Sequence, residues 1–199
     1  GAYEQAIADA GGAAARYVAA GTPAAAGLAF AEKGDLLRIR GEYDAAEEAA
    51  LTIAEVSGAQ FVSGYADPDV IAGQATIARE IADHVPPGFR IVVPVGGGGL
   101  AAGTALGAPS ESVVGVEASA SRAVSTAMRA GHPVHVEIGS TIADGLAGNI
   151  AADALTPAIL RERRVPVIAA DEPGLRAAVR ELALRHGVVA EGTAGAGIA

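Results

Sequence analysis

Short apolar runs rich in Val and Ile alternate along this chain with longer segments whose apolar residues recur at helical spacing. The short runs have the composition of buried strands, and the longer segments have the period of amphipathic helices. Because each strand is nearly continuous in Val and Ile, we expect it to be covered on both faces. The pattern predicts an α/β fold in which parallel sheets are covered by helices on both faces. Strands are expected at residues 35–40, 59–63, 90–95, 112–117 and 165–169, and helices at 13–20, 42–57, 70–84, 100–106, 121–130, 153–162 and 173–186.

Four consecutive glycines connect the strand expected at 90–95 to the helix expected from Leu100. Glycine lets a backbone approach a ligand closely and adopt positive φ angles without a steric cost. The loop leads to a helix N-terminus, where unpaired N–H groups and the positive end of the helix dipole favour an anion. The segment therefore predicts a phosphate site, in which a side chain introduced at Gly98 would fill the space of the anion. The alternative is a glycine-rich turn that only lets the strand and the helix pack closely.

The residues around the glycines narrow the class of phosphate ligand. A nucleoside-triphosphate loop would close on Gly-Lys-Ser or Gly-Lys-Thr, whereas here Gly99 is followed by Leu100. A dinucleotide fingerprint can be placed on Gly97, Gly99 and Ala102, and Glu117 then lies near the position of the acidic ribose ligand. A nucleotide-binding α/β domain therefore stays open as an alternative.

Composition excludes several other classes of protein. The chain has 199 residues, a net charge of −9 and no long basic run, which argues against nucleic acid as a partner. It contains no cysteine, so neither a disulfide framework nor a thiolate metal site is expected. No apolar run reaches the roughly 18 residues of a membrane span, and we expect a cytoplasmic protein. Half of the residues are hydrophobic, but aromatic residues make up only 4%, so the core must be built from small side chains in close contact.

The segment Val93–Leu100 resembles the phosphate loop of the fold-type-II pyridoxal-phosphate enzymes, in the branch of the threonine and serine dehydratases and serine racemase. Further segments that resemble this family, in the same order and spacing, are Asp67–Gln74, Val114–Glu117, Thr141–Gly145 and Val188–Gly192. The resemblance runs from Gly34 to Ala199 and implies a fold like that of the tryptophan synthase β subunit. It also implies pyridoxal 5'-phosphate as the cofactor. The residues implied to hold its phosphate are Gly96, Gly97, Gly98, Gly99 and Leu100.

The resemblance implies an activity as well as a cofactor. It implies an ammonia-lyase, or dehydratase, that converts a 3-hydroxy amino acid such as threonine or serine into a 2-oxo acid and ammonia. The alternatives are an amino-acid racemase of the same family and a catalytically inactive remnant of the fold. The expected partner is a small amino-acid substrate, with no nucleic acid and no membrane, in a homodimer or homotetramer.

The chain departs from the family pattern at the Schiff-base lysine. In the family this lysine lies in a Ser-Phe-Lys-x-Arg-Gly-Ala pattern, whereas this sequence opens with Gly1-Ala-Tyr-Glu, as though it began after that lysine. Lys33, the only lysine of the 199 residues, lies in a polar, acidic turn that favours a solvated ammonium group. The Ser-x-Gly-Asn-His loop that binds the substrate carboxylate in the family is absent too. We expect the 199 residues to be pieces of a larger enzyme and to be inactive alone.

The same comparison with the family pattern predicts the domain organisation. Residues 13–58 are expected to be a remnant of the small domain, and residues 1–12 and 59–199 are expected to form the large cofactor-binding domain. The connections at Gly12–Ala14, Pro23–Gly27 and Gly107–Ala108 are shorter than a crossover between parallel strands requires. We expect the chain to be interrupted at these three places.

Two carboxylates are candidates for catalytic residues. Asp144 lies in a Gly-rich loop and Glu191 precedes Gly192 at the start of a helix, and the resemblance places both near the cofactor. The alternative for Asp144 is a turn residue that accepts hydrogen bonds from its own backbone. The alternative for Glu191 is an acidic residue that stabilises a helix N-terminus.

No metal site is expected. Glu117 occupies a position where relatives hold a divalent cation together with a downstream carboxylate, but Ser121 and Ala123 stand where that second carboxylate would be. Hard cations require several oxygen ligands, so a structural role is expected for Glu117. The four histidines do not have the spacing of metal ligands on a common helix face.

Overall fold

The computed structural model describes residues 43–109 and 112–199, together with residues 4–6, 8, 9, 12, 16 and 19. It divides the chain into two compact units, Gly1–Val62 and Ser63–Ala199. Within the first unit, helix α3 spans Tyr43–Ser57 and confirms the helix expected at 42–57. The strand expected at 35–40 and the connections expected at 13–14 and 23–27 lie outside the described residues. The proposed division at residues 13–58 stays a prediction.

The second unit is built on a parallel sheet of three strands in the order β1-β2-β3. Strands β1, β2 and β3 span Ile91–Pro94, Val113–Ala118 and Val167–Ala170. Ile91 is paired with Val113, and Gly115 with Val167. The strands expected at 90–95, 112–117 and 165–169 are thus confirmed, and so is their parallel arrangement.

The strand expected at residues 59–63 is wrong. These residues form an irregular connection, in which the side chain of Val62 is 52% exposed. The connection turns at Ser63, whose Oγ accepts a hydrogen bond from Ala66 N at 3.1 Å. Among the described residues no strand is paired with this short apolar run, and a strand needs a neighbour to satisfy its backbone groups.

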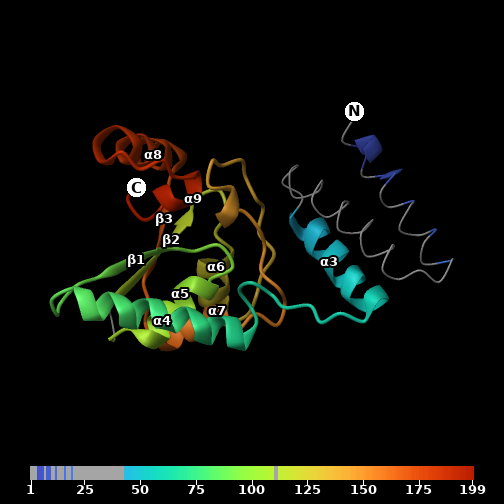
Figure 1. Cartoon of the computed structure of the whole chain (residues 1–199), viewed down its shortest axis with the longest axis horizontal. Helices are drawn as coiled ribbons and strands as arrows, with labels where there is room; N and C mark the ends of the chain where they lie inside the picture. The colour runs from blue at the N-terminus through green and yellow to red at the C-terminus, as the bar shows by residue number, and fades with distance from the viewer. Residues whose placement is uncertain are drawn as a thin grey trace. The chain divides into compact units, whose positions relative to one another are not determined.

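Helices cover both faces of the sheet, as Figure 1 shows. On one face, α4, α5, α6 and α7 enclose a core that includes Val93, Val95 and Leu160. On the other face, α8, α9 and the short helix η1 enclose a second core around Val116 and Leu175. The helices of the second unit span Pro68–His84 (α4), Gly99–Gly107 (α5), Ala123–Ala130 (α6), Asp144–Leu146 (η1), Thr156–Glu162 (α7), Glu172–His186 (α8) and Gly192–Gly195 (α9). The two-sided α/β fold is confirmed.

Small residues allow α4 and α5 to approach closely. A Cβ atom at Gly103 would collide with Gln74 and with the carbonyl oxygen of Ile71, and one at Gly107 would collide with the carbonyl oxygen of Ala75. The backbones of the two helices are therefore in contact, and this is the physical reason for the abundance of Ala and Gly in this region. None of the helices in the described part of the chain has the length and apolar character that crossing a bilayer requires.

The interruption expected at Gly107–Ala108 is wrong. Helix α5 continues into an ordinary C-cap there, where Ala108 N donates to Thr104 O at 2.9 Å. Residues 95–112 form the whole crossover from β1 to β2, which is long enough for a connection between parallel strands. The guanidinium group of Arg163 binds the end of α5, with Nε 2.9 Å from Ala105 O and Nη2 3.0 Å from Ala108 O.

Arg163→Ala should therefore destabilise the fold. Two carbonyl groups at the buried end of α5 would lose a charged donor, and we expect the free energy of unfolding to fall by about 1–3 kcal/mol. Chemical denaturation followed by circular dichroism measures the loss. The control is Arg180→Ala, at an exposed position of α8, which should change stability by less than about 0.5 kcal/mol. Equal effects of the two substitutions would contradict the capping role of Arg163.

Candidate cofactor site

The glycine loop, Gly96–Gly99, lies at the carboxyl end of β1 and begins helix α5. The sheet ladder ends just before it, where Val95 N donates to Val116 O at 2.8 Å. Gly98 is the N-cap of α5 with φ +86°, a left-handed conformation that favours glycine. The first bond of the helix runs from Ala102 N to Gly98 O. The N–H groups of the first helical turn therefore have no intrahelical acceptor, which makes this end of α5 suited to an anion.

Protein neighbours surround the glycine loop closely. A Cβ atom at Gly97 would collide with the ring of Tyr65, and one at Gly99 would lie 2.6 Å from Tyr65 Cα. A Cβ atom at Gly98 would lie 3.0 Å from Cβ of Thr156. The expectation that a side chain at Gly98 would fill the anion's space is therefore corrected, because the chain's own packing already occupies that direction. The close packing of the glycines is confirmed, and anion binding at the loop stays a prediction.

Two side chains that the sequence did not single out hold the loop. Thr156, which is fully buried at the start of α7, donates from Oγ1 to Gly97 O at 2.7 Å. Tyr65 packs its ring on Gly97 and accepts a hydrogen bond at its hydroxyl oxygen from Ala151 N at 2.9 Å. Nothing local in the sequence marks Thr156. The only available signal for Tyr65 was the scarcity of aromatic residues in this chain, which makes each of them notable.

The glycine loop is one of three segments, distant in the sequence, that are linked by close contacts. The other two are the aspartate loop, Thr141–Gly145, and the glutamate turn, Glu191–Gly192. The carbonyl oxygen of Gly145 lies 2.7 Å from the position that a Cβ of Gly96 would take. A Cβ at Gly192 would collide with the carbonyl oxygen of Ile142. Glycines thus let the aspartate loop contact both other segments through backbone atoms.

A buried polar atom without a partner lies in this cluster. Thr193 follows the glutamate turn, and its Oγ1 lies 2.7 Å from the position that a Cβ of Gly145 would take. This oxygen is buried and has no hydrogen-bond partner among the described residues. At the start of α5, the free N–H groups of the first helical turn are donors suited to a phosphate group. The residues present therefore fit a phosphate-bearing cofactor.

Comparison with known families identifies the family of this chain. Residues 8–199 match the model of the family described as "Pyridoxal-phosphate dependent enzyme". This chain belongs to that family. Pyridoxal 5'-phosphate is the cofactor of the family, and the alternative of a nucleotide-binding α/β domain is thereby set aside.

Named relatives of this pyridoxal-phosphate enzyme are ammonia-lyases. The L-threonine ammonia-lyase of Thermotoga maritima is 38% identical over 161 residues, which make up 79% of this chain and 40% of that protein. The L-threo-3-hydroxyaspartate ammonia-lyase of Saccharomyces cerevisiae is 36% identical over 157 residues, 77% of this chain and 48% of that protein. This chain therefore spans less than half the length of these two relatives.

Solved structures of the same fold include a deaminase and a racemase. The threonine deaminase of T.th. matches with a TM-score of 0.65 and 34% identity, over 74% of this chain and 55% of that one. Maize serine racemase matches with a TM-score of 0.69 and 22% identity, over 85% of this chain and 63% of that one, which shows the fold alone. The fold-type-II architecture is confirmed.

The two predicted catalytic carboxylates lie on exposed positions of this pyridoxal-phosphate enzyme. Asp144 begins η1 in the aspartate loop, and its Oδ1 accepts a hydrogen bond from Gly145 N at 3.0 Å. Glu191 is the N-cap residue of α9, and its side chain makes no capping hydrogen bond. Both belong to segments that contact the glycine loop or each other, but the structure gives no direct test of their catalytic roles, which stay predictions.

Glu117 is a buried carboxylate on β2, only 1% exposed. Its Oε1 accepts a hydrogen bond from Ser125 N in α6 at 3.0 Å, while Oε2 has no partner among the described residues. The hydroxyl group of Ser121 is bonded to Gly148. In the part of the chain that the structure describes, no three His, Cys, Asp or Glu side chains are grouped as metal ligands.

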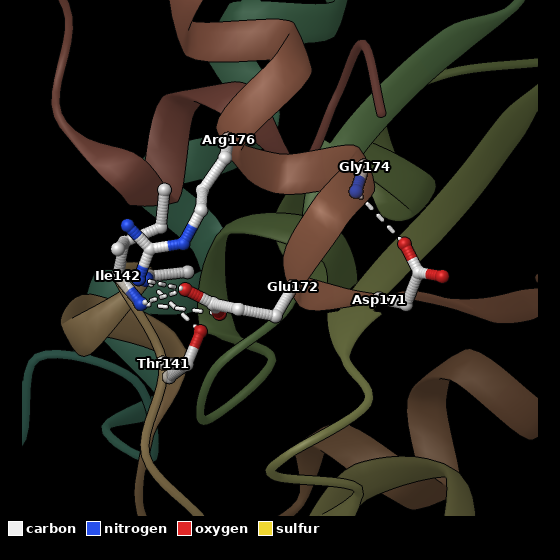
Figure 2. A network of polar contacts seen from close by, with 7 residues as sticks. Thr141, Ile142, Asp171, Glu172, Gly174 and Arg176 are labelled. Atoms are coloured by element: carbon white, nitrogen blue, oxygen red, sulfur yellow. Dashed lines mark hydrogen bonds and ion pairs between the residues drawn. The ribbon is translucent and has the colours of Figure 1, made fainter.

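Glu172 connects helix α8 to the aspartate loop (Figure 2). Ile142 N lies 3.2 Å from Oε1 and 3.3 Å from Oε2 of Glu172. The Thr141 hydroxyl donates to the same carboxylate. Arg176 Nη2 lies 2.8 Å from Oε1 of Glu172. Burial raises the pKa of Glu172, but the hydrogen bonds from Thr141 and Ile142 and the positive charge of Arg176 outweigh it and hold the pKa below its usual 4.5. The sequence indicated only a helix start here, so this contact was missed.

Gly97→Ala should disrupt the glycine loop. The new methyl group would have to displace the ring of Tyr65, so we expect the protein to lose about 1–3 kcal/mol of stability and to bind the cofactor more weakly. The matched control is Gly73→Ala in α4, where nothing lies within 4 Å of the added Cβ. That control should stabilise the protein by about 0.4–1 kcal/mol. Thermal denaturation would contradict the packing described here if both variants were as stable as the wild type.

The Glu172 carboxylate should make stability depend on pH in the acid range. Its pKa is lower in the folded chain than its usual 4.5, so its contribution is complete above that value and is lost as the pH falls through the folded pKa. Arg176, the charged group that faces it, stays protonated throughout. The difference in Tm between wild type and Glu172→Gln should therefore be constant above about pH 5.5 and shrink toward pH 3. A difference that grows on acidification would refute this assignment.

Proposed function

We propose that this protein is a pyridoxal-phosphate-dependent ammonia-lyase that converts a 3-hydroxy amino acid such as L-threonine or L-serine into a 2-oxo acid and ammonia. The observation that carries the proposal is the glycine loop before α5, in a chain whose relatives include L-threonine ammonia-lyases at 38% and 34% identity. Because the chain spans less than half the length of those relatives, activity and substrate are proposals for the protein as a whole.

The proposed role of the glycine loop is to bind the phosphate group of the cofactor. The residues proposed to hold it are Gly96, Gly97, Gly98, Gly99 and Leu100. The N–H groups of the first turn of α5 donate to the phosphate oxygens, and the dipole of the helix stabilises their negative charge. Thr156 supports this arrangement because its hydrogen bond fixes the Gly97 carbonyl group and so orients the neighbouring amides.

The cofactor supplies the electron sink that stabilises negative charge at the substrate Cα. The proposed task of the protein is to orient the substrate and to exclude competing reactions. We assign Asp144 and Glu191 to this part of the site because the aspartate loop contacts both the glycine loop and the glutamate turn. Their exposure leaves both carboxylates able to exchange protons with solvent.

We further infer that the 199 residues alone do not catalyse the reaction. Lys33, their only lysine, follows Glu32 and precedes Gly34 and Asp35. Such an acidic setting keeps an ammonium group charged, whereas a nucleophilic lysine has to be desolvated. The homodimeric or homotetrameric assembly and the cytoplasmic location remain predictions.

The direct test is an assay of the full protein that the gene encodes, beside the 199-residue chain, with pyridoxal phosphate and L-threonine or L-serine. We expect the full protein to release ammonia and an equal amount of 2-oxo acid, and the 199-residue chain to match free cofactor. Chiral chromatography of the remaining amino acid separates lyase from racemase. Accumulation of the D-enantiomer without ammonia would contradict the proposal, and so would ammonia release by the short chain that is lost on Lys33→Ala.

A further inference from the structure

The aspartate loop lies between the glycine loop and the glutamate turn and contacts both through backbone atoms. Its Gly145 carbonyl faces Gly96, and its Ile142 carbonyl faces Gly192. A shift of the aspartate loop by even part of an ångström therefore has to be followed by one of its two neighbours. Whatever fixes the aspartate loop also fixes the glycine loop from one side.

The hydrogen bonds within the aspartate loop are local. Thr141 Oγ1 accepts from Ala143 N at 3.1 Å, and Asp144 Oδ1 accepts from Gly145 N at 3.0 Å. These bonds shape the loop but do not attach it to the sheet or to a helix. The bonds to Glu172 differ because they join Thr141 and Ile142 to the first turn of α8, thirty residues farther along the chain.

We propose that Glu172 is a positioning residue of the cofactor site, which holds the aspartate loop against Gly96 and Gly192 and so sets the position of the phosphate-binding glycine loop. This inference rests on the proposed function, because it takes the glycine loop to be the phosphate site. Glu172 acts through the backbone of the aspartate loop.

A carboxylate suits this task better than a neutral side chain. Ile142 N lies nearly equidistant from the two oxygens of Glu172, and the Thr141 hydroxyl and Arg176 also donate to the carboxylate. Hydrogen bonds to an ionised acceptor are stronger than those between neutral groups. The lowered pKa of Glu172 reflects the same preference for the charged form. The side chain is 31% exposed, so it can meet these donors without the full cost of burying a charge.

Helix α8 also contains a second ion pair, which is a matched control for the effect of losing the ion pair between Glu172 and Arg176. Glu181 and Arg185 form an ion pair with the same four-residue spacing as Glu172 and Arg176, at 3.3 Å. Glu181 is exposed and its carboxylate bonds to Arg185 within the same helix. If Glu172 served only to stabilise α8, Glu181→Ala and Glu172→Ala would have similar consequences.

The experiment compares Glu172→Ala, Glu172→Gln, Arg176→Ala and Glu181→Ala with the wild type. The first measurement is hydrogen–deuterium exchange of peptides that cover residues 138–147 in the cofactor-free protein. The second is the Kd of 4'-deoxypyridoxine 5'-phosphate, a cofactor analogue without the aldehyde, so that no lysine can capture it covalently. The exchange measurement needs no cofactor and no activity.

We expect Glu172→Ala to accelerate exchange at Ile142 and to raise the Kd of the analogue about ten-fold, since two hydrogen bonds to a charged acceptor are lost. Glu172→Gln should be intermediate in both measurements, because the amide keeps one acceptor oxygen. Arg176→Ala and Glu181→Ala should stay within about two-fold of the wild type, as exposed ion pairs contribute little.

The outcomes separate this inference from the proposed function. If the wild type binds the analogue and Glu172→Ala binds it equally well, the positioning role is overturned. If Glu181→Ala matches Glu172→Ala in both measurements, the effect belongs to α8 and the inference is again overturned. If the wild type does not bind the analogue, the cofactor assignment fails. If, in addition, Glu172→Ala leaves the exchange at Ile142 unchanged, the attachment of the aspartate loop by Glu172 is overturned as well.

Discussion

The candidate site depends on backbone-to-backbone contacts that link three segments, the first of which, the glycine loop, lies at the carboxyl end of β1. Gly96, Gly145 and Gly192 each occupy a place where a Cβ atom would collide with, or press against, an atom of a neighbouring segment. This constraint explains why the segments are rich in glycine even where no positive φ angle is required. It also leaves the first turn of α5 with N–H groups that only a ligand or water can satisfy, which is the feature that the proposed phosphate site requires.

Much of this arrangement could be predicted from the sequence because it depends on local signals. The Val- and Ile-rich run before four glycines identified strand, loop and helix, and alternation of strands and helices identified the parallel sheet. The strand expected at 59–63 failed because an apolar run of that length does not reveal whether a partner strand exists. The interruption expected at Gly107–Ala108 was wrong. The hydrogen bonds that hold the end of α5 at this point come from Arg163, which is distant in the sequence.

The residues that support the site could not be predicted, for the same physical reason. Thr156, Tyr65 and Glu172 act on loops that are between 30 and 86 residues away along the chain. Their local sequence contexts indicate a helix start or a polar loop and nothing more. Asp144 and Glu191, in contrast, were visible through resemblance to a family, and their catalytic roles remain predictions.

We propose that the glycine loop and the start of α5 bind the phosphate group of the cofactor. The most direct test is a titration of the ¹⁵N-labelled protein with 4'-deoxypyridoxine 5'-phosphate, followed through the backbone amide resonances. We expect the largest saturable shifts at Gly97, Gly98, Gly99 and Leu100, and we expect inorganic phosphate to shift the same amides. Saturable shifts confined to other residues, with these four amides unmoved, would contradict it.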